Sequence, residues 1–181
     1  VAAFVMEPVQ GAGGVIPPHP SFMPMVRDIC DKHGVLLIAD EVITAFGRTG
    51  SPTGVRHWGV QPDLMCTAKA ITNGYFPFGA VMIADHVAAV FEDDRSGAGS
   101  VDSGYTYSGH PVGAAAAVAA VEETMRIKPW ENAGLRGAEL KAGLQALASR
   151  YEVIGDVRGE GLMCAIALVS DRAAKTPVGK A

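Results

Sequence analysis

"SFMPMVRDICDKHGVLLIADE", residues 21–41, has the pattern of a helix followed by a buried strand. Apolar residues recur at the spacing of one helical face, at Phe22, Met25, Val26, Ile29 and Cys30. Ser21 belongs to the residue types that cap a helix start, and Gly34 stands where a helix would end. Residues 35–39 are apolar without a polar break, which is typical of a strand buried on both faces. This succession predicts an α/β fold with a mostly parallel sheet.

Further elements are expected on both sides of this unit. Apolar runs predict strands at 1–6, which we expect to be buried, and at 63–67 and 79–84, and a polar, glycine-rich loop at 44–59. The pattern then favours helices at 111–127 and 135–149, and two strands within 151–169 joined at a Gly-Glu-Gly turn. The change of character after residue 127 predicts one domain over 1–127 and the beginning of a second over 128–181.

Composition narrows the class of protein. The 181 residues carry a net charge of −4 and no basic run, which argues against nucleic-acid binding. No uncharged apolar stretch is long enough to predict a membrane span. Three widely spaced cysteines indicate reduced thiols in a cytoplasmic protein, and the histidines lack metal-site spacing, so we expect no metal. The chain opens without Met inside an apolar run, and we expect it to be a fragment of a longer protein.

Three of the predicted strands end in an ionisable residue: Glu7, Asp40 and Lys69. In α/β sheets, ligands bind beyond the carboxyl ends of the strands, so these groups would share one edge if the strands are parallel neighbours. Lys69 is the only charge in "CTAKAITNGYFPFGAV", residues 66–81, which predicts a lysine in an apolar, buried setting. Such an amine can lose its proton and condense with a carbonyl. A salt bridge or a solvated strand end is the alternative, and this pattern alone names no cofactor.

Four motifs in order resemble the class III aminotransferases, pyridoxal-phosphate enzymes of fold type I, and within them the ω-transaminase branch. They are "EPVQGAGGVIPP", "LLIADEVITAFGRTG", "PDLMCTAKAITNGYFPFGAV" and "GYTYSGHPVGAAAA". The resemblance implies that 1–127 is the C-terminal half of the cofactor-binding large domain and that 128–181 begins an α+β small domain. Relative to that family, the upstream phosphate loop and the downstream substrate arginine are absent from these residues, so we expect the isolated chain to bind cofactor poorly.

The resemblance also implies roles for single residues. Lys69 would form the Schiff base with pyridoxal 5'-phosphate and later move the substrate proton. Asp40 would pair with the pyridinium nitrogen and keep it protonated. Val42 would pack on one ring face, beside Ile43, at whose position several family branches carry Gln. Glu7 would lie beneath the site.

Two further residues, Tyr105 and Thr106, are implied at the cofactor phosphate. Thr106 would reach the cofactor of a neighbouring subunit, and Tyr105 would help through its backbone, so the resemblance implies a homodimer or a higher homo-oligomer. The implied reaction moves an amino group from an amine or ω-amino acid to a 2-oxo acid such as pyruvate. An aminomutase or a decarboxylase of the same fold, or a non-catalytic relative, remains an alternative. Arg48 in "FGRTG" is expected to be structural.

Overall fold

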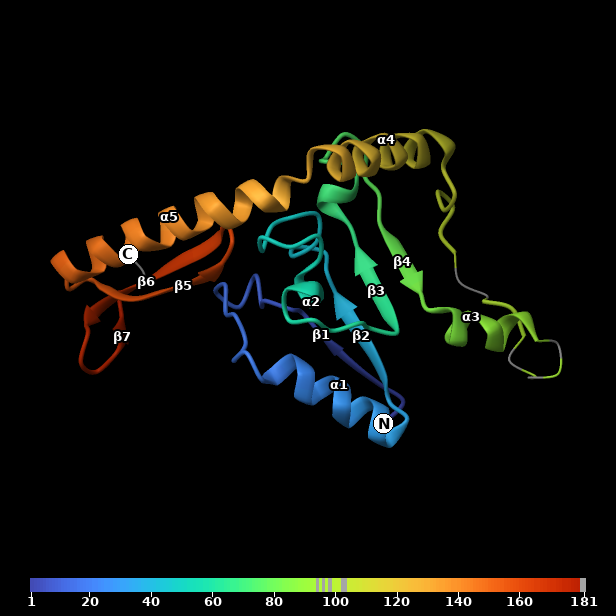
Figure 1. The fold of residues 1–181 in the computed structure, drawn as a ribbon, viewed down its shortest axis with the longest axis horizontal. Coiled ribbons are helices and arrows are strands. Elements are labelled where there is room, and N and C mark those ends of the chain that lie inside the picture. The colour runs from blue at the N-terminus through green and yellow to red at the C-terminus, as the bar shows by residue number, and fades with distance from the viewer. Residues whose placement is uncertain (94, 96, 98, 102–103, 180–181) are drawn as a thin grey trace.

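The computed structural model describes residues 1–93, 95, 97, 99–101 and 104–179, and the chain forms two β-sheets with helices around them (Figure 1). The elements are β1 (Ala3–Met6), α1 (Phe22–His33), β2 (Leu36–Asp40), α2 (Gly54–His57), β3 (Leu64–Thr67), the 3₁₀ turn η1 (Lys69–Ile71), β4 (Ala80–Ile83), α3 (Asp85–Glu92), α4 (Pro111–Ile127), α5 (Pro129–Arg150), β5 (Ile154–Glu160), β6 (Met163–Asp171) and β7 (Thr176–Pro177).

The first sheet has the strand order β1-β2-β3-β4. The first three strands are parallel, with Ile38 opposite Leu64, and β4 runs antiparallel to β3. Figure 1 shows the arrows of β1, β2 and β3 pointing the same way. The predicted α/β fold with a mostly parallel sheet is therefore confirmed.

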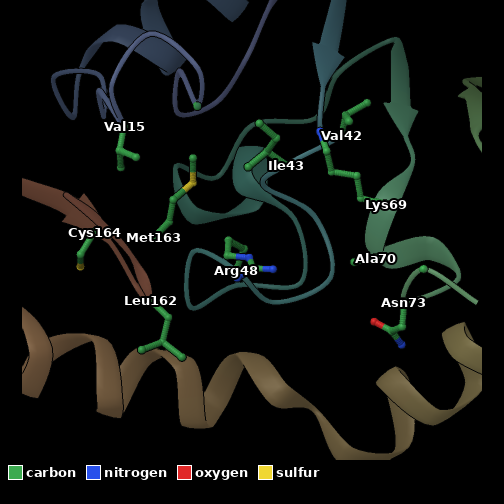
Figure 2. Close-up of a pocket in the computed structure, with 12 residues that line it drawn as sticks. Val15, Val42, Ile43, Arg48, Lys69, Ala70, Asn73, Leu162, Met163 and Cys164 are labelled. Carbon is green, nitrogen blue, oxygen red and sulfur yellow. The ribbon is translucent and has the colours of Figure 1, made fainter. Parts of the chain in front are cut away.

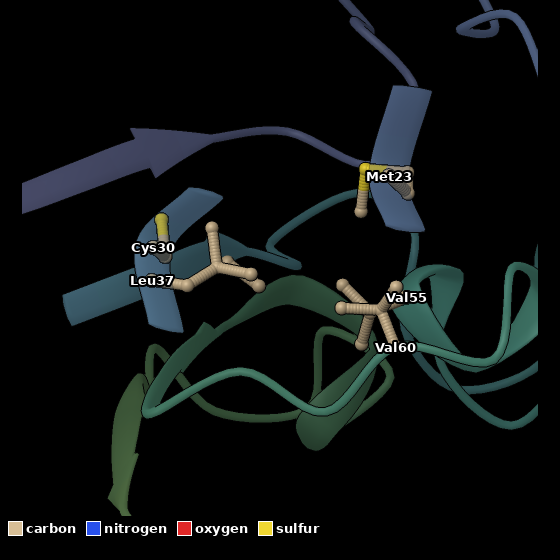
Figure 3. Close-up of a cluster of buried hydrophobic side chains, with 6 residues drawn as sticks. Met23, Cys30, Leu37, Val55 and Val60 are labelled. Atoms are coloured by element: carbon tan, nitrogen blue, oxygen red, sulfur yellow. The ribbon is translucent and has the colours of Figure 1, made fainter. Parts of the chain in front are cut away.

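The core of this half of the molecule lies between α1 and the first sheet (Figure 3). Met23 and Cys30 of α1 pack against a cluster that includes Leu37 of β2, Val55 and Val60. The predicted inner face of the helix was wrong in part. Cys30 is buried as expected, but three of the residues assigned to that face are exposed: Phe22, Met25 and Ile29. The helix carries two apolar stripes, and the fully buried Met23 belongs to the one that faces the sheet.

The expectation that residues 1–6 form a buried strand was wrong with respect to burial. β1 pairs in parallel with β2 as expected, but it is the edge strand of its sheet. Phe4 is 40% and Val5 62% exposed, because no described element covers them.

The second sheet has the order β5-β6-β7, with antiparallel pairs throughout, and α5 packs on it. The two predicted strands are confirmed. The predicted Gly-Glu-Gly turn was wrong in part, because Gly159 and Glu160 belong to β5 and the turn lies at residues 161–162. The short β7 was not predicted. Helix α5 also starts earlier than expected, at Pro129, where proline is tolerated in the first turn. The contact between α5 and the turn requires glycine, since a Cβ on Gly137 would lie 2.1 Å from the carbonyl oxygen of Gly161.

Asp63 joins three elements at the other end of the first sheet. Its carboxylate accepts hydrogen bonds from the backbone N–H of Leu37 at 2.6 Å and from Arg27 at 2.9 Å, and it lies 3.1 Å from the Nε2 atom of His86. Burial alone would raise the pKa of Asp63, but these hydrogen bonds and the charge of Arg27 lower it overall. The ionised carboxylate therefore stabilises the connection between α1, β2 and α3.

Candidate active site

The carboxyl ends of β1, β2 and β3 form one edge of the first sheet. Glu7 directly follows β1, Asp40 is the last residue of β2, and Lys69 begins the η1 turn just after β3. Since the three strands are parallel neighbours, the predicted convergence of these residues on a single edge is confirmed.

A cavity of about 700 Å³ opens beside this edge. Lys69, Val42 and Ile43, three of the predicted site residues, line it together (Figure 2). The opposite wall is apolar and contains Val15, Leu162 and Met163. Segments that follow the strands of the first sheet and residues of the C-terminal hairpin thus meet around one space.

Lys69 has a backbone conformation that is unusual for a residue with a side chain. Its φ is +48°, in the left-handed region. Among the described non-glycine residues, six have a positive φ, and Val15, Lys69 and Asn73 of these line the cavity. Backbone strain of this kind persists only where the surrounding structure holds it, and it gathers at functional sites.

The predicted burial of Lys69 was wrong, because the residue is exposed. β3 ends at Thr67, so Lys69 lies beyond the sheet and its side chain extends into the open cavity toward Val42 (Figure 2). The apolar residues that surround Lys69 in the sequence therefore do not enclose its amine in this chain.

Asp40 is half-buried, and its carboxylate is held in place locally. The backbone N–H of Val42 donates to Oδ1 of Asp40 at 3.1 Å. Asp40 stands opposite Cys66 in the β2–β3 register. Burial and the neighbouring charge of Asp40 raise the pKa of the Cys66 thiol. The strand end thus presents a carboxylate to the edge on which Lys69 also lies.

Glu41, next to Asp40, is a residue that the sequence analysis missed. It is fully buried, and its carboxylate accepts hydrogen bonds from the Thr44 hydroxyl at 2.5 Å, from the Gly54 N–H at 2.8 Å and from the Val55 N–H at 2.7 Å. These bonds connect Glu41, next to Val42, both to Thr44 and to the start of α2. They also provide acceptors for the first two backbone N–H groups of α2. That short helix lies within the predicted loop at 44–59.

Glu7 holds the glycine loop that follows β1. Its Oε2 atom accepts a hydrogen bond from the N–H of Gly11 at 2.8 Å. A Cβ on Gly11 would lie 2.4 Å from Cδ1 of Ile43, so any larger residue there would require the Ile43 side chain to move. Glu7 therefore acts on the cavity through the backbone of the loop.

Tyr105 and Thr106 do not line this cavity. Both are exposed, and the N–H of Tyr105 donates to the Ser108 hydroxyl at 2.8 Å. Their implied contact with the cofactor of a neighbouring subunit stays a prediction.

Arg48, which we expected to be structural, does line the cavity. Its carbonyl oxygen also accepts a hydrogen bond from the N–H of Leu162 at 3.1 Å. No sequence pattern indicated the residues that the C-terminal hairpin contributes to the cavity, Leu162, Met163 and Cys164, because their position at the cavity depends on how that hairpin docks.

Neither a metal site nor a membrane-spanning helix is found among the described residues. There, no three His, Cys, Asp or Glu side chains are grouped so that they would hold a metal ion. None of the helices that are described combines the length and the apolar character needed to cross a bilayer. The cavity itself offers the amine of Lys69, which can condense with a carbonyl. Asp40 does not line the cavity; it lies on the adjacent sheet edge, where its carboxylate can hold a proton on a basic nitrogen.

Comparison with known proteins identifies the class. The family model described as "Aminotransferase class-III" matches residues 1–181, the whole chain. The chain therefore belongs to the class III aminotransferase family, as its motifs predicted.

Individual relatives agree with this assignment. The chain is 45% identical over 172 residues to an uncharacterised aminotransferase of Sinorhizobium fredii, covering 95% of this chain and 37% of that protein. It is 42% identical over 173 residues to the putrescine–pyruvate aminotransferase of Pseudomonas aeruginosa, with the same coverage. A solved amine transaminase from an uncultivated Pseudomonas species, in its PLP-bound form, superposes with a TM-score of 0.92 at 48% identity over 98% of this chain and 40% of that one. The chain thus spans about two fifths of the length of these relatives.

Proposed function

We propose that this chain is the lysine-bearing part of a pyridoxal-phosphate-dependent aminotransferase. The enzyme would move an amino group from an amine or an ω-amino acid to a 2-oxo acid such as pyruvate. The observation that carries the proposal is the edge of the first sheet, where Lys69 and Asp40 follow two adjacent parallel strands beside a cavity. Membership of the class III family and the putrescine–pyruvate relative support the reaction type.

The residues present fit the cofactor in size and in chemistry. A cavity of about 700 Å³ accommodates a small cofactor, Lys69 supplies an amine, and Val42 and Ile43 supply an apolar surface for a ring. When bound, pyridoxal phosphate supplies an aldehyde that reacts with amines and a ring that accepts electrons. The solved amine transaminase, which resembles this chain closely, was crystallised with that cofactor.

We assign a role to each residue on this basis. Lys69 binds the cofactor covalently through Nζ, and the same atom, once free, moves the proton at the reacting carbon of the substrate. Asp40 holds a proton on the ring nitrogen with its carboxylate, whose Oδ1 atom is oriented by the N–H of Val42. Val42 and Ile43 pack against the ring, and Glu7 supports the loop at Gly11.

The assembly and domain organisation are part of the same proposal. Thr106 reaches the cofactor phosphate of a partner subunit with help from Tyr105, so the active unit is at least a homodimer. The exposure of both residues is compatible with such a contact. Residues 1–127 belong to the cofactor-binding domain and 128–181 begin the small domain, with Lys128 at the junction of α4 and α5. A cytoplasmic location fits the three free cysteines.

Borohydride reduction of the intact gene product with pyridoxal phosphate, followed by mass spectrometry of its peptides, tests the proposal. We expect the added mass on the peptide that contains Lys69. The variant Lys69→Arg keeps the charge but cannot form the bond, and should carry no label there. Label on another lysine, or on none, would overturn the assignment.

A half-reaction with an amine then separates the proposed transaminase from a mutase or a decarboxylase. Consumption of the amine and release of the corresponding carbonyl product, without added 2-oxo acid, is the expected result. Loss of carbon dioxide, or an isomerised amine, would instead identify one of the other two reactions.

A further inference from the structure

The loop at residues 10–16 forms part of the cavity wall and is closed by its own backbone. Gln10 and Ile16 pair across it with N–O distances of 3.1 and 2.9 Å, and the N–H groups of Gly14 and Val15 both donate to the carbonyl of Gly11 at 3.1 Å. Gly11 and Val15 line the cavity. The conformation of this loop therefore determines the position of the part of the cavity wall that Gly11 and Val15 form.

The tip of the loop is strained. Gly14 has a φ of +120°, and Val15, a β-branched residue, has a φ of +53°. A β-branched side chain in the left-handed region is an outlier that costs roughly 1–3 kcal/mol. Contacts from outside the loop are needed to hold it in this form.

Arg158, on β5 in the C-terminal sheet, supplies that contact. Its Nε–H donates to the carbonyl of Gly14 at 2.8 Å and to that of Val15 at 3.1 Å. Its Nη1 atom is held at 2.8 Å by Asp156, two residues away on the same strand. A Cβ on Gly14 would lie 3.0 Å from Nη2 of Arg158, so the two surfaces fit closely.

The same hairpin completes the wall on the other side. After β5 the chain turns at Gly161, and Leu162 and Met163 line the cavity. Figure 2 shows Val15 and Met163 on one side of the cavity and Lys69 on the other. The position of β5 relative to the loop thus fixes the whole apolar wall opposite the lysine.

We propose that Arg158 is a positioning residue that preforms this wall for the apolar part of an amine donor. It acts through the backbone of Gly14 and Val15 and touches neither cofactor nor reacting atoms. The inference rests on the proposed function, since that function makes the cavity a substrate site. Without Arg158 the loop would be ordered only when the amine binds, which weakens binding of the ground state and the transition state equally.

The test compares three variants of the intact gene product. Arg158→Met keeps the aliphatic stem and removes every donor, Arg158→Lys keeps the charge and one point of contact, and Asp156→Asn changes only the partner of Nη1. Hydrogen–deuterium exchange of the peptide that covers residues 10–16, without substrate, is the first measurement. We expect at least about tenfold faster exchange in Arg158→Met, an intermediate value in Arg158→Lys and little change in Asp156→Asn.

Steady-state kinetics with ethylamine and benzylamine as donors and pyruvate as acceptor is the second measurement. We expect KM for benzylamine to rise about tenfold in Arg158→Met, with kcat within about twofold and partial rescue in Arg158→Lys. A purely structural role would lower the amount of folded enzyme and leave KM unchanged. Unchanged exchange in residues 10–16 of a folded Arg158 variant would overturn the inference. Absence of cofactor on Lys69 in the unaltered protein would overturn the proposed function instead, and leave the exchange result standing.

Discussion

Replacing Glu41 by glutamine tests the support beneath the site most directly. The carboxylate of Glu41 accepts three hydrogen bonds, from Thr44, Gly54 and Val55, and no part of the residue is exposed. An amide has a single oxygen, so in Glu41→Gln at least one of the two backbone N–H groups faces an NH₂ group. We therefore expect this variant to lose stability at the start of α2.

The expected magnitude follows from those contacts. A hydrogen bond to a charged group contributes about 1.5–3 kcal/mol, and a buried donor left without a partner costs about 1–3 kcal/mol. Part of this loss is offset because a neutral amide is less costly to bury than a carboxylate. We expect a net loss of about 2–3 kcal/mol, which corresponds to roughly 30- to 150-fold faster exchange of the amides of Gly54 and Val55.

Hydrogen exchange of residues 53–60 in the intact gene product measures this loss. Glu139→Gln, which removes one partner of an exposed pair with Arg136, is the matched control and should change stability by less than about 0.5 kcal/mol. Thr44→Val replaces the hydroxyl by a methyl group, removes one of the three hydrogen bonds, and should cost about 1 kcal/mol. If the amides of residues 53–60 exchange in Glu41→Gln at rates within about threefold of those in the unaltered protein, the carboxylate does not hold this segment.

Three other predictions concern packing, acid stability and cofactor affinity. Gly137→Ala should destabilise the protein by at least about 2 kcal/mol in urea unfolding, because its Cβ would meet the carbonyl of Gly161. Gly143→Ala, in the same helix with nothing within 4 Å of the new atom, should be neutral or stabilise by up to about 1 kcal/mol. The pKa of Asp63 is lowered in the folded protein, so its contribution to the free energy of unfolding is present above the unfolded pKa of about 4 and is lost as pH falls further. Asp63→Asn should therefore make the free energy of unfolding fall less steeply at acid pH. An unchanged acid dependence would contradict this assignment. The isolated 181-residue chain should bind pyridoxal phosphate poorly by absorbance titration, and tight binding would show that these residues suffice.

The main sheet and the edge that carries the candidate site residues could be predicted from the sequence. An uninterrupted apolar run predicted β2, and the short stretch "DLMCT" predicted β3. The charges that follow them, Asp40 and Lys69, predicted the edge on which they meet. These features are local: a run of apolar residues and the charge that ends it lie within a few positions of each other. Parallel pairing then brings them together.

Features that depend on distant segments could not be predicted in this way. The apolar pattern of α1 fits two faces, and only the docking of the helix on β2 buries Met23 and leaves Met25 and Ile29 exposed. Lys69 was expected to be buried because its sequence neighbours are apolar, yet burial depends on what faces the side chain across the cavity. The strands of the C-terminal hairpin were predicted, but its docking beside the cavity was not, since Arg48, the partner of Leu162, lies far away in the sequence.

The contact between Arg158 and Gly14 joins residues 144 positions apart, and this separation affects how the molecule comes into being. A ribosome that adds about 5–20 residues per second needs roughly 7 to 30 s to travel from one to the other. During that interval the strained loop has emerged and its partner strand has not been made. The first sheet, whose strands are close in sequence, can assemble during synthesis, whereas the cavity wall can close only after β5 has emerged. The order of synthesis thus places the completion of the cavity wall after the assembly of these strands of the first sheet.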